Sequence, residues 1–573
     1  MGGTSASERP RPHGRGGPLR KPALQDAAFL VGAVGLSAAL YVTGLGFYSD
    51  DWTVVGYAGM SADQTFMGIF RAIYGDLVQM RPVQFLYLAG LYKVFGLDPL
   101  GYHVVNTLVL AAGAVLFYLV LRELREPRVL ALTVPLVYAL LPHYSADRFW
   151  VAAFQATLSM TLFFLCLYAD LKAWRPNASP SRRLAWGLDW RWKAVSVAAL
   201  LSSALAYEVF LPLFLFSPVL VGYAARQRAS ARPRSVGVLA SFAPNLLALG
   251  AVALFKVRTT SRADFGADDP VYHIEWFAKL VKSSAEVGFV ELGLALPFRL
   301  HQIAGAYFDG ATFVVGGALG ALVFLYLSRV AEPSALPSVA RAVAYGAAGL
   351  VLFVAGYAVF LTNYNALVTA TGIANRVAIA GAVGVALCFA AGAGGISALF
   401  RSTPMRRWVF CAIVAFLAGG GLVVNATVAS FWVEAYDEEQ RVLAAVQNHF
   451  PVLPQGSTVL IDGLCPYVGP AVVFESSWDL AGALMLRYRD YALRADVLTP
   501  TSEVEDEGIS TSIYGGAIYT LYPYGENVYV YDYRRDASTP LPNAGAARRY
   551  FESAGIAEPP CPAGSAGYGV PIF

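Results

Sequence analysis

Long apolar runs, each matching the thickness of a bilayer, dominate this sequence and leave it few ways to fold. A helix needs about 20 apolar residues to cross roughly 30 Å of hydrocarbon, where every backbone polar group must be satisfied internally. Charged residues make up only 14% of the chain and apolar residues 57%, whereas ordinary globular domains are about a quarter charged. The sequence therefore predicts a polytopic α-helical membrane protein with about eleven transmembrane helices. The predicted spans lie near 24–46, 100–121, 129–142, 150–171, 195–225 (two helices), 236–255, 303–328, 342–361, 377–400 and 408–428.

Residues 1–22 precede the first run and are rich in Gly, Pro, Arg and Ser. Such a composition cannot bury a core, so we expect a disordered, basic, cytoplasmic N-terminus. The apolar run behind it is too long for the central region of a secretory signal and lacks a clear small-residue cleavage site, which favours an uncleaved anchor. Residues 23–429 then form the predicted transmembrane domain.

The distribution of Lys and Arg predicts the orientation of the spans, because cytoplasmic loops retain positive residues. The short basic connections expected inside are 122–128, 172–193, 226–234 and 401–407. Alternation of the spans then places outside the segments 47–99, 143–149, 256–302 and 362–376, and everything after about residue 429. Segment 256–302 is itself basic, but moving it inside would break the assignment of its neighbours. The predicted orientation has the N-terminus inside and the C-terminus outside.

Residues 430–573 change character, because the apolar runs shorten and acidic residues gather in 503–507. Residues 457–461 are typical of a buried strand, 479–491 of an amphipathic helix, and 519–533 alternate in strand fashion about a turn at 525–527. We read the acidic run as a solvated loop. The tail is therefore predicted to be a soluble extracytoplasmic α/β domain.

The five cysteines divide by location. Cys166, Cys388 and Cys411 lie inside apolar runs and are expected to be small core residues. Cys465 and Cys561 lie in the tail assigned to an oxidising compartment, where they can form a disulfide. Two free thiols remain the alternative.

Two adjacent aspartates, Asp50 and Asp51, directly follow the first apolar run. On their own they are an ordinary way to begin a helix, since Ser49 and the aspartates can accept the unpaired amide protons of a first turn. Their neighbours in the predicted outer segments favour chemistry instead. These are Arg81-Pro82, the sequence GYHVVN at 101–106, Pro142-His143 and Tyr207-Glu208.

In order and topology this set resembles the GT-C superfamily of membrane glycosyltransferases, which includes the protein O-mannosyltransferases and the lipid A aminoarabinose transferases. The resemblance is clearest over about residues 40–225, and Tyr207 stands where related chains often carry Lys. GT-C enzymes use sugar donors carried on a polyprenyl phosphate, so the resemblance implies a site at the outer ends of the helices. One carboxylate would act as the general base that deprotonates the acceptor hydroxyl. The resemblance favours Asp50 as this base, with Asp51 orienting it or binding a cation.

Cations are needed where the polyprenyl phosphate leaves, because negative charge develops there in the transition state. Arg suits phosphate, since its planar fork binds two oxygens at once. We take Arg81, Arg148 and Arg376 as candidates, with His143 as a further donor. Three of them also have a structural alternative: Arg81 as a helix cap or interfacial anchor, Arg148 as the partner of Asp147, and His143 as a cap of the third helix. Arg376 stands at the start of a membrane helix, where a cation is unfavourable beside the helix's positive end, and this favours a role in binding.

The sequence thus predicts a glycosyltransferase of a bacterial cytoplasmic membrane that moves a sugar from a polyprenyl-phosphate donor to a glycan, lipid or protein acceptor at the outer face, with inversion. A divalent cation is left open, and nothing points to nucleic acid. The alternatives are a polytopic transporter or lipid flippase, and a non-enzymatic membrane anchor for the tail. No internal repeat is visible, although transporters commonly contain one. P-loop, CxxC and HExxH motifs are also missing from the sequence.

Overall fold

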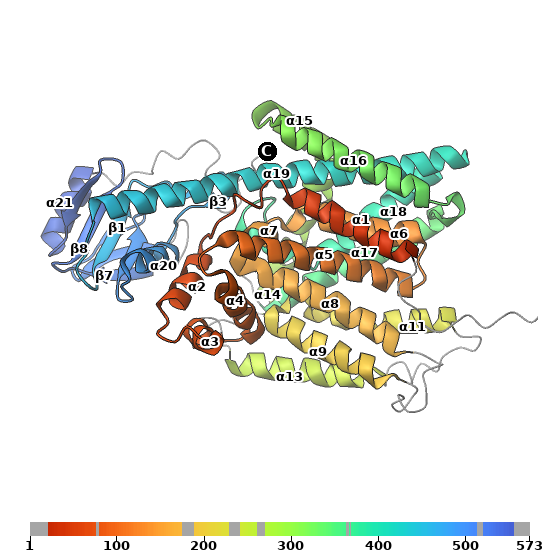
Figure 1. The fold of residues 1–573 in the computed structure, drawn as a ribbon, viewed down its shortest axis with the longest axis horizontal. Helices are drawn as coiled ribbons and strands as arrows, with labels where there is room; N and C mark the ends of the chain where they lie inside the picture. Colours follow the sequence, from red (N-terminus) through yellow and green to blue (C-terminus); the bar gives the residue numbers. More distant parts are fainter. Residues whose placement is uncertain are drawn as a thin grey trace, which may run out of the picture.

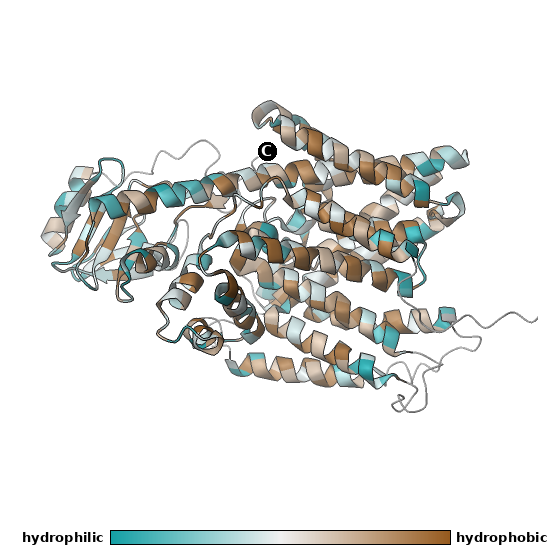
Figure 2. Ribbon diagram, in the orientation of Figure 1, coloured by the Kyte–Doolittle hydropathy of each residue, from teal (hydrophilic) through white to brown (hydrophobic). Residues whose placement is uncertain are grey.

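The computed structural model describes residues 21–75, 79–174, 188–228, 241–259, 270–362, 366, 368–512 and 519–554. A helical bundle occupies one end of the molecule and a smaller α/β domain the other, and the long helix α19 (Thr403–His449) runs from one to the other (Figure 1). Hydrophobic residues, drawn in brown, predominate along the bundle helices, while hydrophilic residues are frequent in the small domain and at the opposite ends of the helices (Figure 2). The predicted N-terminal segment lies outside the described residues, apart from its last two positions.

The first half of the bundle follows the predicted runs closely. Its helices are α1 (Lys21–Ala38), α2 (Asp50–Met60), α3 (Phe66–Gly75), α4 (Pro82–Phe95), α5 (Pro99–Glu123), α6 (Arg128–Leu140), η1 (Pro142–Tyr144), α7 (Ala146–Phe149), η2 (Val151–Ala153), α8 (Phe154–Ala173), α9 (Trp190–Ala206), η5 (Glu208–Phe210), α10 (Leu211–Phe214) and α11 (Ser217–Arg228). The break predicted near Tyr207-Glu208 is present between α9 and η5.

The second half departs from the predicted runs most clearly before α16. The segment predicted as an outer loop, 256–302, is mostly helical, and α16 begins at Gly310 rather than at 303 because Asp309 accepts hydrogen bonds from the amides of Ala311 and Thr312. The π-helix η7 and helix α15 precede it. The helices are α13 (Ala243–Thr259), α14 (Pro270–Ala285), η7 (Glu286–Leu294), α15 (Leu296–Ala306), α16 (Gly310–Val330), η8 (Pro333–Ala335), α17 (Val339–Gly356), η9 (Ala358–Thr362), η10 (Ile373–Ala378) and α18 (Ala382–Ala398).

Within the described residues, five helices are long and apolar enough to cross a membrane, or six if the bent pair 208–214 and 217–227 forms one span. Helices α6 and α18 are apolar but shorter. The chain therefore has the multi-pass helical character predicted from its composition. The larger number of about eleven spans stays a prediction.

Small residues let the helix backbones approach closely, as is common in membrane bundles. A Cβ added at Gly384 of α18 would lie 2.3 Å from the backbone oxygen of Gly349 on α17, and one at Gly349 would lie 2.8 Å from the oxygen of Gly384. Helices α16 and α19 meet in the same way at Gly316 and Gly419. Van der Waals contact between backbones therefore joins the second half of the bundle.

An ion pair and several hydrogen bonds join the helices at the end of the bundle that lies away from the α/β domain. The carboxylate of Asp26 accepts hydrogen bonds from Arg128 (2.7 and 2.8 Å), Tyr118 (2.6 Å) and Tyr326 (2.7 Å), which connects α1, α5, α6 and α16. Arg125 donates to the backbone oxygen of Gln227 at 2.6 Å, so two of the predicted inner connections lie side by side. The assignment of these connections to the cytoplasmic side stays a prediction.

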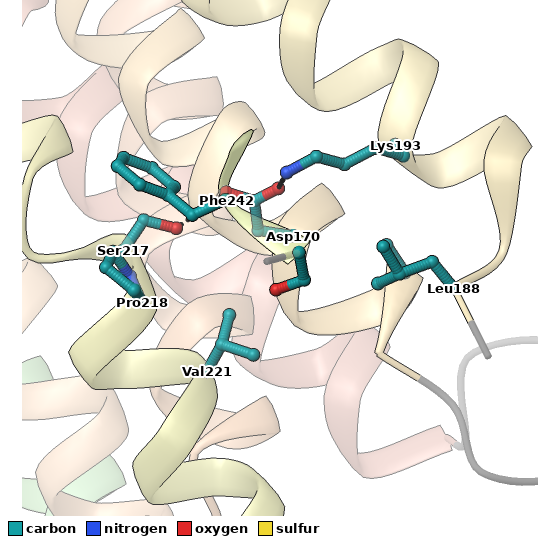
Figure 3. A pocket seen from close by; sticks show the side chains of 9 residues that line it. Asp170, Leu188, Lys193, Ser217, Pro218, Val221 and Phe242 are labelled. Atoms are coloured by element: carbon teal, nitrogen blue, oxygen red, sulfur yellow. Dashed lines mark hydrogen bonds and ion pairs between the residues drawn. The ribbon is translucent and has the colours of Figure 1, made fainter. Parts of the chain in front are cut away.

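A second polar cluster lies between α8, α9, α11 and α13. Figure 3 shows three of its residues, Asp170, Lys193 and Ser217, beside a small cavity. Asp170 pairs with Lys193 at 2.8 Å and accepts hydrogen bonds from Ser196 (2.6 Å), Ser217 (2.6 Å) and Asn245 (3.0 Å). The adjoining cavity measures only about 10 Å³. Because every oxygen of this buried carboxylate has a donor, the cluster fastens four helices together.

The α/β domain has a four-stranded sheet in the order β4-β1-β8-β9. Strand β1 lies in the middle and runs parallel to β4 and β8, while β9 is antiparallel. The predicted strand at 457–461 and the predicted helix at 479–491 correspond to β1 and α20. The strands and helices are β1 (Thr458–Asp462), β2 (Tyr467–Val468), β3 (Ala471–Val472), α20 (Ser477–Tyr488), β4 (Arg494–Val497), β5 (Glu503–Val504), β6 (Gly508–Ser512), β7 (Tyr519–Pro523), β8 (Val528–Asp532), β9 (Ala537–Pro540) and α21 (Ala544–Ala554).

Other details of the tail differ from the predictions. Strands β7 and β8, predicted on either side of a turn, join different sheets, and the acidic run begins with the short strand β5 rather than being loop throughout. Helix α19 continues without a break across the predicted domain boundary at 429/430. Cys465 is held in a disulfide. Its predicted partner Cys561 lies outside the described residues, so this pairing stays a prediction.

Candidate active site

The loop that carries the two aspartates is fixed by contacts from distant parts of the chain. The Tyr48 hydroxyl donates to the backbone oxygen of Trp432 on α19 at 2.8 Å, and Trp150 Nε1 donates to the backbone oxygen of Tyr48 at 3.0 Å. Ser49 is buried and has a φ of 48°, which is unusual for a residue other than glycine. Strained backbone of this kind is often found at functional sites.

Asp51 points into the protein and is fully engaged there. Its carboxylate accepts amide hydrogen bonds from Tyr48 (2.9 Å), Val151 (3.1 Å) and Ala152 (2.6 Å), and only 1% of the residue is exposed. Two of these amides open η2, directly before α8. Asp51 therefore caps a helix start that is about a hundred residues away in sequence.

Asp50 has the opposite environment, although it is the adjacent residue. Its side chain is exposed, and no hydrogen bond or ion pair joins its carboxylate to another described residue. Desolvation by the surrounding protein raises the pKa of Asp50, while the charges of Arg376 and Arg81 oppose this rise. Ser49 makes no side-chain cap at the start of α2. An accessible carboxylate with a raised pKa has the properties of a general base.

Arg81 lies directly before α4 and forms an ion pair with Glu208. Its Nε is 3.1 Å from Glu208 Oε2, and its Nη2 contacts Oε1. The guanidinium also stacks over the Tyr207 ring, 4.7 Å from the ring centroid. Lys256 of α13 contacts the same carboxylate at 3.1 Å and donates to the backbone oxygen of Met80 at 3.2 Å. Two cations thus share one acid. We call these three residues, Arg81, Glu208 and Lys256, the Glu208 cluster.

Arg376 lies in η10, and its guanidinium lies over the Trp150 ring, 5.2 Å from the centroid. The neighbouring Asn375 fixes this turn, because its Oδ1 accepts from the Ala146 amide at 3.0 Å and its Nδ2 donates to Ser145 at 2.8 Å. The charge of Arg376 acts on Asp50. Segments that are more than two hundred residues apart therefore meet at one place.

Asp147 adds a buried carboxylate that the sequence did not single out as a site residue. Only 1% of the residue is exposed, and neither carboxylate oxygen has a hydrogen-bond partner among the described residues. Burial raises the pKa of Asp147 well above its usual value, although the charges of Arg376 and Arg148 oppose the rise. The suggested Arg148–Asp147 ion pair is not formed.

The structure brings Asp50, Arg81 and Arg376 together, but it places the other two predicted phosphate ligands elsewhere. Arg148 is buried, donates to the backbone oxygen of Ala139 and lies near the Tyr144 ring. His143 Nε2 bonds the backbone oxygen of Gly288 in η7 at 2.8 Å. Burial lowers the pKa of His143 to about 4, so the ring is neutral at ordinary pH. Both side chains have structural partners rather than a place beside Asp50.

The α/β domain also contacts this region. Ser49 Oγ lies 3.4 Å from Glu475 Oε1, and Trp52 Nε1 donates to Glu439 on α19 at 3.1 Å. Helices α2 and α20 approach so closely that a Cβ on Gly482 would lie 2.4 Å from the Trp52 oxygen. The domain therefore packs directly on the helix that begins with Asp50.

A divalent cation finds no ready set of ligands here. No group of three or more His, Cys, Asp or Glu side chains in the described ranges could hold a metal ion. Arg376 already supplies positive charge beside Asp50 and Asp147.

Sequence reasoning assigned no site role to Lys256, Glu208 and Asp147. Lys256 was visible as a basic residue directly after an apolar run, and Glu208 as part of the Tyr207-Glu208 pair. Their partnership with Arg81 could not be read from spacing, since it joins α4, η5 and α13. Asp147 was named only as the partner of Arg148 in the structural alternative for that arginine.

Solved structures that resemble this chain include ArnT from Cupriavidus metallidurans bound to undecaprenyl phosphate, with 15% identity, a TM-score of 0.35, and coverage of 82% of this chain and 85% of that one. The same protein in its apo state gives 15% identity and a TM-score of 0.34 over the same shares. An oligosaccharyltransferase from Archaeoglobus fulgidus, tethered to an acceptor peptide, has 12% identity and a TM-score of 0.37, with coverage of 81% of this chain and 63% of that one.

These proteins are glycosyltransferases of the GT-C superfamily, the group that the sequence resembles. No family model matches the chain, and no curated protein matches its sequence.

Proposed function

We propose that this protein is a membrane glycosyltransferase that transfers a sugar from a polyprenyl-phosphate donor to an acceptor at the outer face of a bacterial cytoplasmic membrane. The observation that carries the proposal is the contrast between the two aspartates. The Asp51 carboxylate accepts three amide hydrogen bonds. Asp50 is instead exposed, and its carboxylate interacts electrostatically with Arg376 and Arg81. An accessible base beside cations is what transfer from a phosphate-linked donor requires.

In the proposed reaction, the acceptor hydroxyl gives its proton to the Asp50 carboxylate as its oxygen bonds to the anomeric carbon. The bond from that carbon to the phosphate oxygen breaks, and its electron pair leaves with the polyprenyl phosphate. Arg81, Lys256 and Arg376 stabilise the charge that develops on this leaving group. A single displacement of this kind inverts the anomeric centre.

The arrangement of the bundle is consistent with a lipid-linked donor. Arg81 and Lys256 lie at the ends of α4 and α13, where a phosphate at the membrane interface can reach them while its chain stays in hydrocarbon. Arg binds phosphate through its fork, and Lys acts as a point charge. His143 and Arg148 receive no role in the reaction.

The charges of Arg81 and Arg376 both act on Asp50. A secondary transporter would instead place its site near the bilayer midplane between repeated halves. An anchor for the α/β domain would not need Asp50, Arg81 and Arg376 to converge. Neither alternative is favoured by a particular feature of the site.

A reconstituted assay tests the proposal. Purified protein in liposomes is given a panel of polyprenyl-phosphate sugars with envelope glycans, lipids and peptides as acceptors, and release of polyprenyl phosphate is measured. Release that depends on an acceptor, and that is lost in Asp50→Asn, is expected. No release with any donor and acceptor would contradict a transferase.

The proposed orientation is tested separately with reporter fusions. A fusion at residue 573 should be active only when the reporter works outside the cytoplasm, because the α/β domain and Asp50 are proposed to share the outer face. A reporter that is active only in the cytoplasm would reverse the topology and refute the outer-face reaction.

A further inference from the structure

Glu208 is placed to control how much positive charge the donor site offers. Its two carboxylate oxygens are shared between Arg81 and Lys256. The side chains are only partly exposed, at 22% for Arg81, 20% for Glu208 and 12% for Lys256. Charges in such a half-buried setting are weakly screened, so a single added or removed charge has a large effect.

The three described residues of the Glu208 cluster carry two positive charges and one negative charge. Glu208 also occupies two of the donor groups of Arg81, Nε and Nη2. Arg376 does not change this balance, because Asp50 and Asp147 are the acidic groups on which its charge acts. The site therefore offers little positive charge beyond what one phosphate diester would neutralise.

We propose that Glu208 is a specificity-determining residue that limits the donor to lipids carrying a single phosphate and discriminates against lipid diphosphates. The proposal rests on the proposed function, since it concerns the donor of that reaction. A sugar joined to a lipid through one phosphate carries one negative charge at that group. The corresponding diphosphate carries two, and its second charge would lie beside the Glu208 carboxylate.

Binding of lipid esters tests this without depending on catalysis or on the identity of the sugar. The probes are farnesyl methyl phosphate and the P-methyl ester of farnesyl diphosphate, which differ by one phosphate and carry a methyl group in place of the sugar. Their affinities for the full chain in detergent are measured by isothermal titration calorimetry. The wild-type protein should bind the monophosphate ester at least about tenfold more tightly.

Glu208→Gln keeps the shape of the side chain and an oxygen for Arg81 but removes the negative charge. The ratio of the two affinities should then shift toward the diphosphate by about 10- to 100-fold. Glu123→Gln is the matched control, because Glu123 also pairs with a lysine, Lys172, and is similarly exposed at 22%. It should leave the ratio unchanged.

Three results would overturn the proposal. These are a wild-type preference for the diphosphate ester, an unchanged ratio in Glu208→Gln, and an equal shift in Glu123→Gln. A wild-type preference for the diphosphate ester overturns the proposal even if a variant fails to fold. A protein that shows the predicted ratio but no transfer activity would contradict the proposed reaction alone, whereas failure of both esters to bind would remove the phosphate site itself.

Discussion

Exchanging each of the adjacent aspartates for asparagine should have opposite effects. Asp51→Asn should damage stability, because the amide nitrogen of Asn would replace one of two oxygens that both accept backbone amides. Asp50→Asn should leave stability nearly unchanged, since no hydrogen bond joins that carboxylate to a described residue. Turnover should respond in the opposite way. Asp50→Asn should lose most of its activity, because it removes the base, whereas folded Asp51→Asn should keep more.

The contacts set the size of these effects. A buried donor left without a partner costs about 1–3 kcal/mol, so Asp51→Asn, which strands one amide, should destabilise the protein by roughly that amount. Asp51→Ala strands all three amides, and a loss of about 3–9 kcal/mol is comparable with the whole stability of a domain. Asp50→Asn should stay within about 0.5 kcal/mol of the wild type and lose about 10²–10⁴-fold in turnover.

Thermal unfolding of the purified variants in detergent gives the stabilities, and release of polyprenyl phosphate in liposomes gives turnover per folded protein. If Asp50→Asn were active and Asp51→Asn were stable but inactive, the base would be Asp51. If both variants were active, the proposed mechanism at this loop would be refuted.

Three further predictions concern the donor site, the bundle and the α/β domain. Arg81→Ala should raise the KM for the donor about tenfold or more, since a phosphate loses its charged partner; steady-state kinetics with an unchanged KM would exclude that role. Gly384→Ala should destabilise the bundle, because its Cβ would lie 2.3 Å from a backbone oxygen. Gly392→Ala on the same helix is the control and should be neutral, because its Cβ would meet nothing within 4 Å. Equal melting temperatures of the two variants would contradict the close packing of α17 on α18. Burial raises the pKa of Asp496 to about 6. The protonated carboxyl therefore stabilises the folded domain by about 3 kcal/mol. This stabilisation is fully present below about pH 4 and is lost as the pH rises through about 6. Unfolding followed between pH 4 and 7 should show this decline in the wild type and a flatter profile in Asp496→Asn; parallel profiles would refute it.

The sequence predicts the helices well where hydrophobicity alone decides. Helices α5, α8, α16 and α17 coincide with long apolar runs, because lipid selects for continuous apolar length. The stretch from α14 to α15 belongs to segment 256–302, which the alternation of the spans assigned to an outer loop, and its apolar residues are interrupted by Glu275, Lys279 and Lys282. Such a mixed pattern is compatible with a helix whose exposed face is partly charged, and the periodicity did not distinguish the two.

The site was predictable in its residue types but not in its geometry. The pairing of Asp50 and Arg81 with outer segments followed from topology and resemblance. The division of labour between Asp50 and Asp51 did not, because it depends on amides at Val151 and Ala152. No site role was predicted for Lys256 for the same reason, since only tertiary packing brings it to Glu208.

A structure of the protein with bound polyprenyl phosphate tests the central claim most directly. The account predicts that phosphate oxygens lie within about 3 Å of Arg81 or Lys256, with the lipid chain leaving the bundle sideways and the Asp50 carboxylate facing the place of the sugar. A phosphate bound at the opposite end of the bundle, or one remote from both cations, would contradict it.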